Sequence, residues 1–345
     1  MYCETYPGVH WIDIELERKA ALFSDLKAMF ALCRIFRTVR PDIVHSIMPK
    51  AGLMSAIAGF LCRVPVRMHT FTGQVWATRT GVVRRLFRAV DRLIVGLNTL
   101  CMTDSPSQSD FLFWQGISFS GQPLPVLSRG SLSGVDIGRF HPDDAMRGKV
   151  RSSLGIPDDA TVFLYLGRLS REKGILDLAK AFASLRDDSA HLILAGPDEE
   201  MTIAEALPQL GLCRERVHVT GFVAQAEQMF MAADVLCLPS YREGFGSVVI
   251  EAAACGVPAI GSRIPGLVDA IEDGVTGMLF PVRDVESLAI CMRAMLRDSA
   301  KRRSMGEQAR CRVERLFSAD VMYQALRSRY FDLLKGEGMF AGASR

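Results

Sequence analysis

Two glutamates separated by a glycine-containing turn are the residues of this sequence best placed for chemistry. Glu243 and Glu251 stand eight positions apart in SYREGFGSVVIEAAACGVP. Gly244 and Gly246 disfavour a continuous helix, so we expect Glu243 on a loop and Glu251 on a helix that starts near Ser247 and ends at the closing Gly-Val-Pro. Free backbone amides at the start of that helix would donate hydrogen bonds to an anionic or hydroxylated ligand. A surface glutamate and a helix-cap glutamate joined by a turn would have the same spacing.

A second candidate group is cationic. Arg168 and Lys173 lie in GRLSREKG, directly after the apolar run Thr161–Leu166. A guanidinium fork and an ammonium close together can neutralise a diphosphate. Two solvated loop cations would give the same pattern. Two weaker turn signals, Gly196–Pro197–Asp198 and Gly221–Phe222–Val223, follow other apolar runs.

The elements that would position these residues alternate between short apolar strands and amphipathic helices. Near-continuous apolar strands between helices indicate a parallel sheet covered on both faces, with ligands beyond the carboxyl ends of the strands. In the second half the sequence predicts strands at Thr161–Leu166, His191–Ala195, Val217–Thr220, Val235–Leu238, Pro258–Gly261 and Gly277–Phe280, and a helix over 175–185.

The first half repeats this alternation less completely. Here the sequence predicts strands at Trp11–Leu16, Ile43–Ile47, Val66–Thr70, Leu100–Thr103 and Pro125–Leu127, with helices near 22–37, 51–62 and 82–94. A stretch dense in Gly, Ser, Asp and Pro, 128–144, predicts a boundary between two domains. A chain of 345 residues also exceeds the usual size of one core.

Charge and cysteine content exclude several classes of protein. The net charge of +3 is too small for a chain that binds nucleic acid along its length. The charge is uneven, +6 over residues 1–150 and −3 over the rest, so we expect any anionic partner surface in the first half. Nine scattered cysteines without a Cys-x-x-Cys pair indicate reduced thiols and a cytoplasmic location.

Together these motifs resemble a known enzyme family. GRLSREKG, LAGPDEE, VTGF, AADVLCLPSYREGFGSVVIEAAACGVPAIGS and IPGLVDAIEDGVTGMLFP are similar, in this order, to family 4 of the retaining glycosyltransferases, over about 44–298. PDIVHSIMPKAG and RMHTFTGQVWATRTG resemble the branch that acts in capsule, O-antigen and lipid-linked glycan assembly. The resemblance implies an α/β GT-B fold, in which two doubly wound Rossmann-like domains face a cleft. It also implies transfer of a sugar, with retention, from a nucleotide diphosphate sugar, with UDP as the expected nucleotide.

The resemblance also implies roles for individual residues. Arg168 and Lys173 would bind the donor diphosphate, Glu251 the ribose, and Glu243 the donor sugar near its anomeric carbon. His69 matches a family histidine that faces the donor sugar, although a histidine in this position, taken alone, is more often a core or capping residue. The sugar and phosphate cradle would be completed by the backbone of Gly244, Phe245, Gly246 and Ser247.

No metal or other cofactor is expected. Departure of a nucleoside diphosphate builds negative charge, which preplaced Arg, Lys and helix-end amides can stabilise. No Asp-x-Asp motif occurs, and the acidic series Asp13–Glu15–Glu17 falls on an expected strand far from the other signals. Two other functions stay open: a nucleotide-sugar-binding protein without turnover, and a GT-B-like nucleotide-sugar epimerase. An assay without acceptor separates the epimerase from the transferase.

Features of the first half point to the acceptor. In 79–94, apolar residues recur at helical spacing beside Arg84, Arg85, Arg88 and Arg92, and such a basic amphipathic helix can rest on an anionic membrane surface. A core helix with a solvated face fits the same pattern. Lys50 is a candidate contact to the pyrophosphate of a lipid-linked acceptor. We therefore expect a peripheral protein at the inner face of the cytoplasmic membrane.

The start of the chain departs from the family pattern. It opens at YPGVHWIDIEL, which resembles a third-strand region, so we expect the first strand, glycine-rich loop, helix and strand of the pattern to be missing. The first sheet should then expose an edge or a face. We expect an N-terminal acceptor-side domain over 1–140, a donor-binding domain over 141–318, and a C-terminal helix region over 319–345 that packs back on the first domain.

Overall fold

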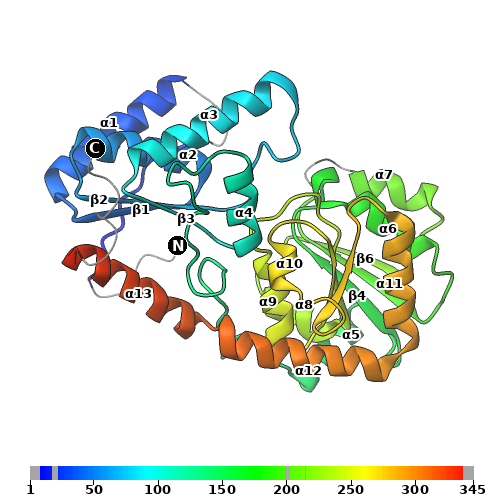
Figure 1. Ribbon diagram of the computed structural model, residues 1–345. Coiled ribbons are helices and arrows are strands. Elements are labelled where there is room, and N and C mark those ends of the chain that lie inside the picture. Colours follow the sequence, from blue (N-terminus) through cyan, green and yellow to red (C-terminus); the bar gives the residue numbers. More distant parts are fainter. Residues whose placement is uncertain (1–7, 18–21, 199, 201, 214, 337–345) are drawn as a thin grey trace.

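Two lobes, each built on a parallel β-sheet, make up the molecule (Figure 1). The structure is a computed structural model and describes residues 8–17, 22–198, 200, 202–213 and 215–336. Both lobes are α/β, as the sequence predicts.

The first lobe holds a three-stranded sheet in the order β1-β2-β3. Helices α1, α2 and α3 lie together on one side of this sheet, and α2 contacts both of the others (Figure 1). The elements are α1 (Leu22–Val39), β1 (Ile43–Ser46), α2 (Pro49–Leu61), β2 (Val66–Phe71), α3 (Gly81–Leu97), β3 (Leu100–Thr103) and α4 (Pro106–Trp114).

The second lobe holds a six-stranded sheet in the order β6-β5-β4-β7-β8-β9. Strands β4 and β5 are buried almost throughout, which explains their unbroken apolar sequence. The elements are α5 (Asp144–Ser153), β4 (Thr161–Leu166), the 3₁₀-helix η1 (Arg171–Lys173), α6 (Ile175–Ala183), β5 (Ala190–Ala195), α7 (Thr202–Gln209), β6 (Val217–Gly221), α8 (Ala226–Ala232), β7 (Val235–Leu238), α9 (Ser247–Ala254), β8 (Ala259–Ser262), α10 (Leu267–Ala270), β9 (Gly277–Phe280) and α11 (Val285–Arg297).

The strand order places a topological switch point in the second sheet. From β4 the chain moves outward to β5 and β6, then returns to the other side of β4 with β7 and continues to β8 and β9. In open parallel sheets, ligands bind beyond the carboxyl ends of the two strands at such a point. The loops after β4 and β7 are therefore the expected ligand-binding loops.

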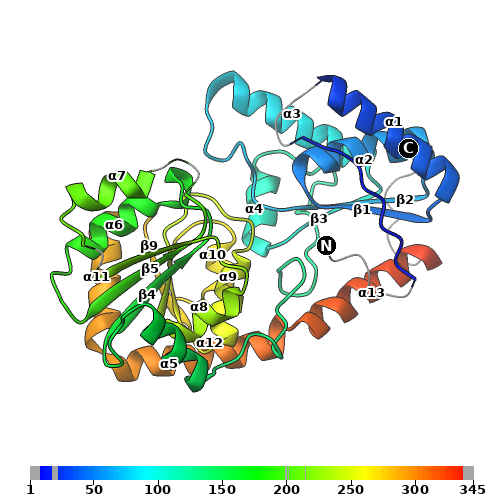
Figure 2. The same ribbon diagram turned by 180° about the vertical axis from the view of Figure 1, so that it is seen from behind.

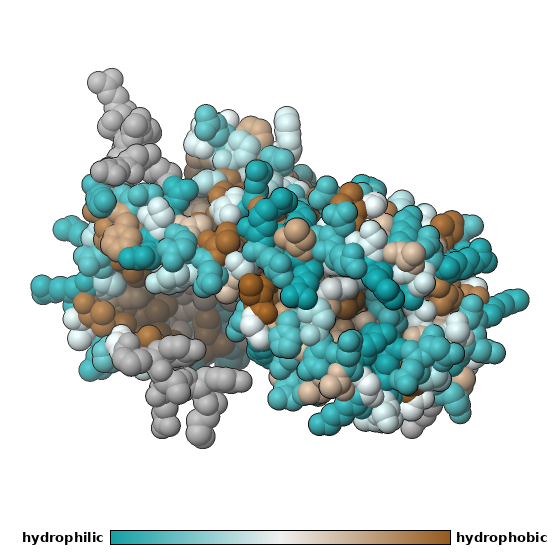
Figure 3. Space-filling model, turned by 90° about the horizontal axis from the view of Figure 1, so that it is seen from below, coloured by the Kyte–Doolittle hydropathy of each residue, from teal (hydrophilic) through white to brown (hydrophobic). Residues whose placement is uncertain are grey.

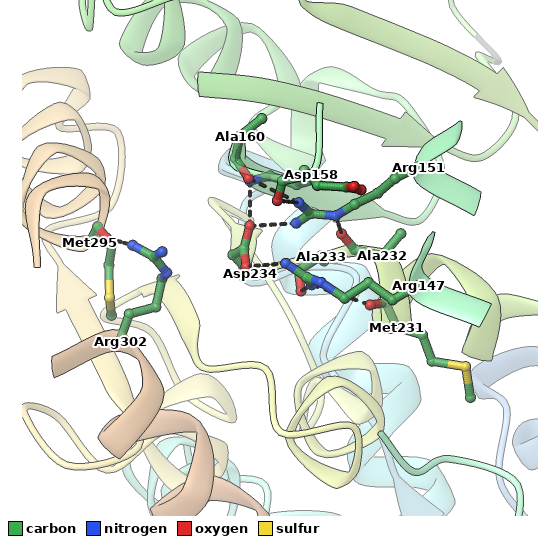
Figure 4. A network of polar contacts seen from close by, with 11 residues as sticks. Arg147, Arg151, Asp158, Ala160, Met231, Ala232, Ala233, Asp234, Met295 and Arg302 are labelled. Carbon is green, nitrogen blue, oxygen red and sulfur yellow. Dashed lines mark hydrogen bonds and ion pairs between the residues drawn. The ribbon is translucent and has the colours of Figure 1, made fainter. Parts of the chain in front are cut away.

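A buried ion-pair network fixes α5 to the second sheet (Figure 4). The side chain of Arg151 is only 1% exposed, and its Nη2 lies 2.7 Å from Oδ2 of Asp234, just before β7. The other carboxylate oxygen of Asp234 accepts from Arg147 at 2.8 Å. Arg151 also donates to the carbonyls of Asp158, Ala160 and Ala232, so the whole guanidinium is hydrogen-bonded.

The last two helices cross from the second lobe to the first (Figures 1 and 2). They are α12 (Ser299–Leu316) and α13 (Ala319–Lys335). Met322 of α13 packs with Val66, Met68 and Met102 of the first sheet. The hydroxyl of Tyr330 lies 2.7 Å from Nδ1 of His45 on β1. Helices thus cover both faces of the first sheet, with α1–α3 on one side and α13 on the other.

Surface chemistry differs between the lobes. Seen from below, the second lobe is largely hydrophilic, whereas hydrophobic residues are more frequent on the first lobe (Figure 3). An open apolar groove on α13 is lined by Tyr323, Leu326, Tyr330, Phe331 and Leu334. Among the described residues, no helix is long and apolar enough to cross a membrane.

The predicted strands of the second half are all present, to within one or two residues at their ends. Two predictions in the first half are wrong. Residues 11–16 form no strand, because they have no strand neighbour, and Trp11 and Ile12 are more than half exposed. Residues 125–127 contribute only an isolated bridge from Val126 to Thr103, since Pro125 has no amide hydrogen for a ladder.

Candidate active site

The loops after β4 and β7 meet through an ion pair. Nζ of Lys173, in η1, lies 2.5 Å from Oε1 of Glu243, in the loop after β7. The hydroxyl of Ser240 donates to the same oxygen at 2.7 Å. The Glu243 side chain is 14% exposed and that of Lys173 is 22% exposed, so neither is a fully solvated surface charge. The switch point thus carries a partly buried anion and cation in direct contact.

Arg168 belongs to the same corner of the sheet. Its carbonyl accepts a hydrogen bond of 2.7 Å from the hydroxyl of Tyr165, a side chain with no exposed surface. Burial raises the pKa of Tyr165, and the negative charge of Glu243 raises it further. Arg168 itself is half-buried. Tyr165 therefore lies beside Arg168 and within the field of Glu243, the partner of Lys173.

Glycines shape the loop that carries Glu243. Gly246 has φ +84° and precedes α9, where a Cβ would lie 2.5 Å from Leu267. A Cβ on Gly244 would lie 2.3 Å from the carboxylate of Asp104 in the first lobe. Helix α9 begins at Ser247 and ends before Gly256, as the sequence predicts. Residues 243–246, here called the donor loop, can therefore lie close to the first lobe only because glycine occupies these positions.

Glu251 lies on α9 in different surroundings from Glu243. Burial raises the pKa of Glu251, the nearby positive charge of Arg139 lowers it, and the negative charge of Glu227 raises it. Arg139 forms an ion pair with Glu227, with Nη2 2.7 Å from Oε2. The two glutamates of the sequence motif therefore face two separate cationic groups, Lys173 and Arg139.

His69 is held in the first lobe by contacts on several sides. It lies on β2 with Nδ1 2.9 Å from the hydroxyl of Ser46, and its ring meets that of Phe71 edge-on at 4.5 Å between centroids. A Cβ on Gly52 would lie 2.3 Å from the imidazole, so that glycine makes room for the ring. Burial lowers the pKa of His69 to about 4, and the neighbouring His45 contributes in the same direction. His69 is therefore neutral at physiological pH.

The loop that follows β2 reaches across to the donor loop. A Cβ on Gly73 would lie 2.6 Å from the backbone of Glu243, and Nη1 of Arg242 donates to the Gly73 carbonyl at 3.0 Å. Farther along the same loop, the hydroxyl of Thr78 donates to Glu172 at 3.1 Å. Residues 72–80 thus connect β2, the strand that carries His69, to the donor loop.

Sequence reasoning missed several members of this interface. Gly73, Asp104, Ser240 and Arg242 were not among the candidates, although the structure places them against the donor loop. The glycine between a strand and a helix in TFTGQ was the available signal for Gly73. No comparable signal marks Asp104, which follows β3 like any polar residue that ends a strand.

Lys50 has partners within the first lobe. Its Nζ lies 2.5 Å from Oδ1 of Asp25 on α1, and it donates to the carbonyl of Glu17 at 2.7 Å. The structure therefore ties Lys50 to α1 and the segment before it.

The N-terminal part of helix α3 differs from the core helix with a solvated basic face that the sequence also allows. Its apolar residues Val82, Val83 and Leu86 are at least half exposed. Two of its arginines turn inward: the guanidinium groups of Arg84 and Arg88 lie 5.7 and 5.9 Å from the ring of Trp76. The prediction of a core helix with a solvated basic face is wrong for the N-terminal half of α3, because the exposed side chains there include the apolar ones.

Within the described residues, no group of three or more His, Cys, Asp or Glu side chains is arranged to hold a metal ion.

Comparison with known proteins identifies the chain's relatives. Residues 146–312 match the family model described as glycosyl transferases group 1, and residues 3–122 match a glycosyl transferase 4-like domain. The chain is 29% identical over 329 residues to the capsular polysaccharide biosynthesis glycosyltransferase CapM of Staphylococcus aureus, covering 93% of this chain and 85% of that protein. It is 30% identical to the N-acetyl-alpha-D-glucosaminyl L-malate synthase of Bacillus anthracis, covering 55% of this chain and half of that protein's length.

Solved structures show the same architecture. The chain superposes on HepE of Anabaena in complex with UDP with a TM-score of 0.76 and 21% identity, covering 89% and 82% of the two chains. It superposes on a sucrose-phosphate synthase from Thermosynechococcus elongatus with a TM-score of 0.81 and 25% identity, covering 94% and 81%. The fold is therefore GT-B, and the chain belongs to the glycosyl transferases group 1 family of glycosyltransferases.

Proposed function

We propose that the protein transfers a sugar from a UDP-sugar, with retention and without a metal ion, to a lipid-linked glycan in the assembly of a cell-surface polysaccharide. The observation that carries the proposal is the Lys173–Glu243 pair at the switch point of the second sheet, beside Arg168. The match to CapM over most of both chains supports the polysaccharide context, and the UDP-bound HepE structure supports the nucleotide.

The donor diphosphate would bind at the cationic corner. Lys173 pairs with Glu243 in the structure, and an arriving diphosphate would offer Lys173 a second anionic partner. Arg168 on the same loop would share the phosphate charge that builds as the nucleotide leaves. The backbone of Gly244, Phe245, Gly246 and Ser247 would line the other side.

Glu243 would then hold the hydroxyls of the donor sugar, while Glu251, farther along α9, would hold the ribose. Neutral His69 would offer its Nε2 to the sugar, because Ser46 already occupies Nδ1. In the proposed reaction the acceptor hydroxyl attacks from the face that the diphosphate leaves. The leaving phosphate takes the acceptor proton, so no protein residue has to be a covalent nucleophile.

The acceptor side would face the membrane through α3. The exposed residues Val82, Val83, Leu86 and Phe87 offer apolar surface, and exposed Arg85 offers positive charge. Helix α1 adds exposed Phe23 and Phe30 in the same helical layer of the first lobe (Figure 1). An anionic membrane surface would satisfy both kinds of side chain. Lys50, between these helices at the start of α2, would contact the acceptor pyrophosphate if it exchanged Asp25 for that ligand.

Titration calorimetry with UDP, first in EDTA and then with magnesium, tests the donor site. We expect equal affinity in both conditions, and Arg168→Ala should weaken binding by about 1.5–3 kcal/mol, the scale of charged hydrogen bonds. Arg186→Ala, which changes a loop cation after α6, is the matched control. Binding that requires magnesium, or an Arg168 variant with unchanged affinity, would contradict the proposal.

Transfer itself needs a separate assay. A panel of labelled UDP-sugars is incubated with membrane extracts that contain lipid-linked glycans, and NMR of the product shows the configuration of the new bond. We expect a product with retained configuration. Nucleotide binding with no transfer to any extract would favour a binding protein without turnover, and sugar isomerisation in the absence of acceptor would favour an epimerase.

A further inference from the structure

Asp104 occupies an unusual position between the lobes. It directly follows β3, is only 4% exposed, and lies beneath the donor loop of the other lobe. One of its carboxylate oxygens is 2.3 Å from the point where a Cβ on Gly244 would lie. The other oxygen, Oδ1, is buried and has no hydrogen-bond partner in the part of the chain that the structure describes.

The surroundings of Asp104 are acidic. Glu243 faces it from the donor loop and Asp269 faces it from α10, and both raise its pKa. The cations beside these two carboxylates have partners of their own: Lys173 pairs with Glu243, and Arg312 donates to the backbone carbonyl of Asp269 at 2.7 Å. Burial is the largest cause, and the pKa of Asp104 rises from its ordinary 3.8 to about 7 although its own amide opposes the shift.

The residues that follow Asp104 also make contacts that join the two lobes. The hydroxyl of Ser105 donates to the Gly244 carbonyl at 3.4 Å. The amide of Ser107 donates to Asp269 at 2.9 Å, and the amide of Gly266 donates to the Ser107 hydroxyl at 2.7 Å. Separation of the lobes would break these contacts and uncover the Asp104 carboxyl at the same time.

We propose that Asp104 is a positioning residue that couples docking of the donor loop to uptake of one proton. With the lobes together and the pH below about 7, its carboxyl is neutral, because a charge there would be unpaired and close to Glu243 and Asp269. With the lobes apart water reaches the carboxyl, which then releases its proton. Asp104 acts through Gly244 on the position of Glu243. The consequence for sugar transfer rests on the proposed function, whereas the docking equilibrium does not.

The direction of the pH dependence follows from the two states. Below pH 3.8 the carboxyl is protonated in both, so docking has no proton cost. Between 3.8 and about 7 only the docked state holds the proton, and docking weakens as the pH rises, by up to tenfold per pH unit. Above about 7 the effect levels off. From pH 5 to pH 8 the docking constant should therefore fall on the order of a hundredfold.

Small-angle X-ray scattering of the full chain from pH 5 to pH 8 tests the proposal without any substrate. Asp104→Asn keeps the shape of the side chain and removes its titration. We expect the wild-type radius of gyration to increase with pH and that of the variant to stay at the compact value. Ser107→Ala, which loosens the docked state without touching the carboxyl, brings the equilibrium into the measurable range if the wild type stays compact. The radius of gyration from pH 5 to pH 8 is then compared between S107A and the double variant S107A/D104N.

Equal pH dependence with and without Asp104, in both backgrounds, would overturn the proposal, as would a D104N variant more open than the wild type at pH 8. Titration with UDP-glucose adds a second readout. We expect tighter binding to D104N than to the wild type at pH 8, whereas a purely structural role predicts weaker binding. If neither protein binds UDP-glucose but scattering still separates them, the proposed donor fails and the docking proposal stands.

Discussion

At the scale of single residues, Glu243 has the most specific surroundings in the candidate site. It is held by Lys173 and Ser240 on one side, and the backbone of its loop touches the first lobe at Gly73. A carboxylate placed in this way can orient sugar hydroxyls, while the phosphate charge is left to Arg168 and Lys173.

Glu243→Gln should abolish sugar transfer and leave UDP affinity largely unchanged, because the proposed role of this side chain is on the sugar. Calorimetry with UDP and a transfer assay on the same preparation measure the two effects. Glu205→Gln, on α7, is the matched control and should transfer normally. Parallel loss of UDP binding and transfer in E243Q would remove the assignment.

His69 should show no titration at physiological pH. Burial lowers its pKa to about 4 from the ordinary 6.5, so the folded protein disfavours the charged ring. The contribution of neutral His69 to the free energy of unfolding is therefore complete above pH 6.5, and it is lost as the pH falls from 6.5 toward 4. NMR of the imidazole protons between pH 5.5 and 8 should show a constant chemical shift for His69. A midpoint above 6 for His69 would contradict its environment.

At the scale of elements, the second lobe depends on the attachment of α5 to β7. Arg151 is almost fully buried and pairs with Asp234, and helix packing alone would leave that charge uncompensated. The ion pair is therefore expected to decide whether the N-terminal part of this lobe packs at all.

Asp234→Ala should destabilise the protein by about 3–5 kcal/mol, because removing one partner strands a buried guanidinium. Denaturant unfolding followed by circular dichroism measures the change. Asp188→Ala is the control, since this aspartate is fully exposed in its pair with Arg216, and we expect no measurable change. If D234A were as stable as the wild type, water would have to solvate the Arg151 guanidinium in place of Asp234.

The start of one helix also determines contacts between the two lobes. Helix α4 starts with Ser105 as its cap, and the hydroxyl of this serine accepts from the amide of Gln108 at 3.2 Å. The same turn supplies Ser107 to Asp269 in the second lobe. One helix start thus serves both the local fold and the joining of the lobes.

At the scale of the whole molecule, the apolar side chains that are not used in packing gather in the first lobe. Exposed Val82 and Leu86 on α3 and Phe23 and Phe30 on α1 lie in the helical layer on one side of the first sheet (Figure 1). This distribution separates the proposed donor site of the second lobe from a proposed membrane-facing surface of the first.

Leu86→Glu should weaken binding to vesicles that contain anionic phospholipid, because it places a negative charge in the exposed apolar row of α3. Co-sedimentation with phosphatidylglycerol vesicles at low and high salt measures the effect, and we expect at least a tenfold loss. Ile290→Glu, at a position on α11 that is also more than half exposed, should bind like the wild type. If I290E loses binding to the same extent, adsorption is not specific to α3.

The sequence alone determined the architecture of the second lobe and the local form of its motif. Buried parallel strands must be continuously apolar, so β4, β5 and β7 could be predicted almost to the residue. Gly246 and Gly256 likewise predicted where α9 begins and ends, since backbone conformation at glycine is a local property.

Only the tertiary structure decided which residues meet. Strand order, which brings the loops after β4 and β7 together, depends on pairings between distant segments, and no local pattern encodes it. The same holds for Asp104 beneath Gly244 and for Gly73 against Glu243, because contact between lobes depends on how two separately formed sheets dock. For the same reason the sequence did not show that the apolar side of α3 faces outward. Helical spacing defines a face, and only the packing of Arg84 and Arg88 against Trp76 decides where that face points.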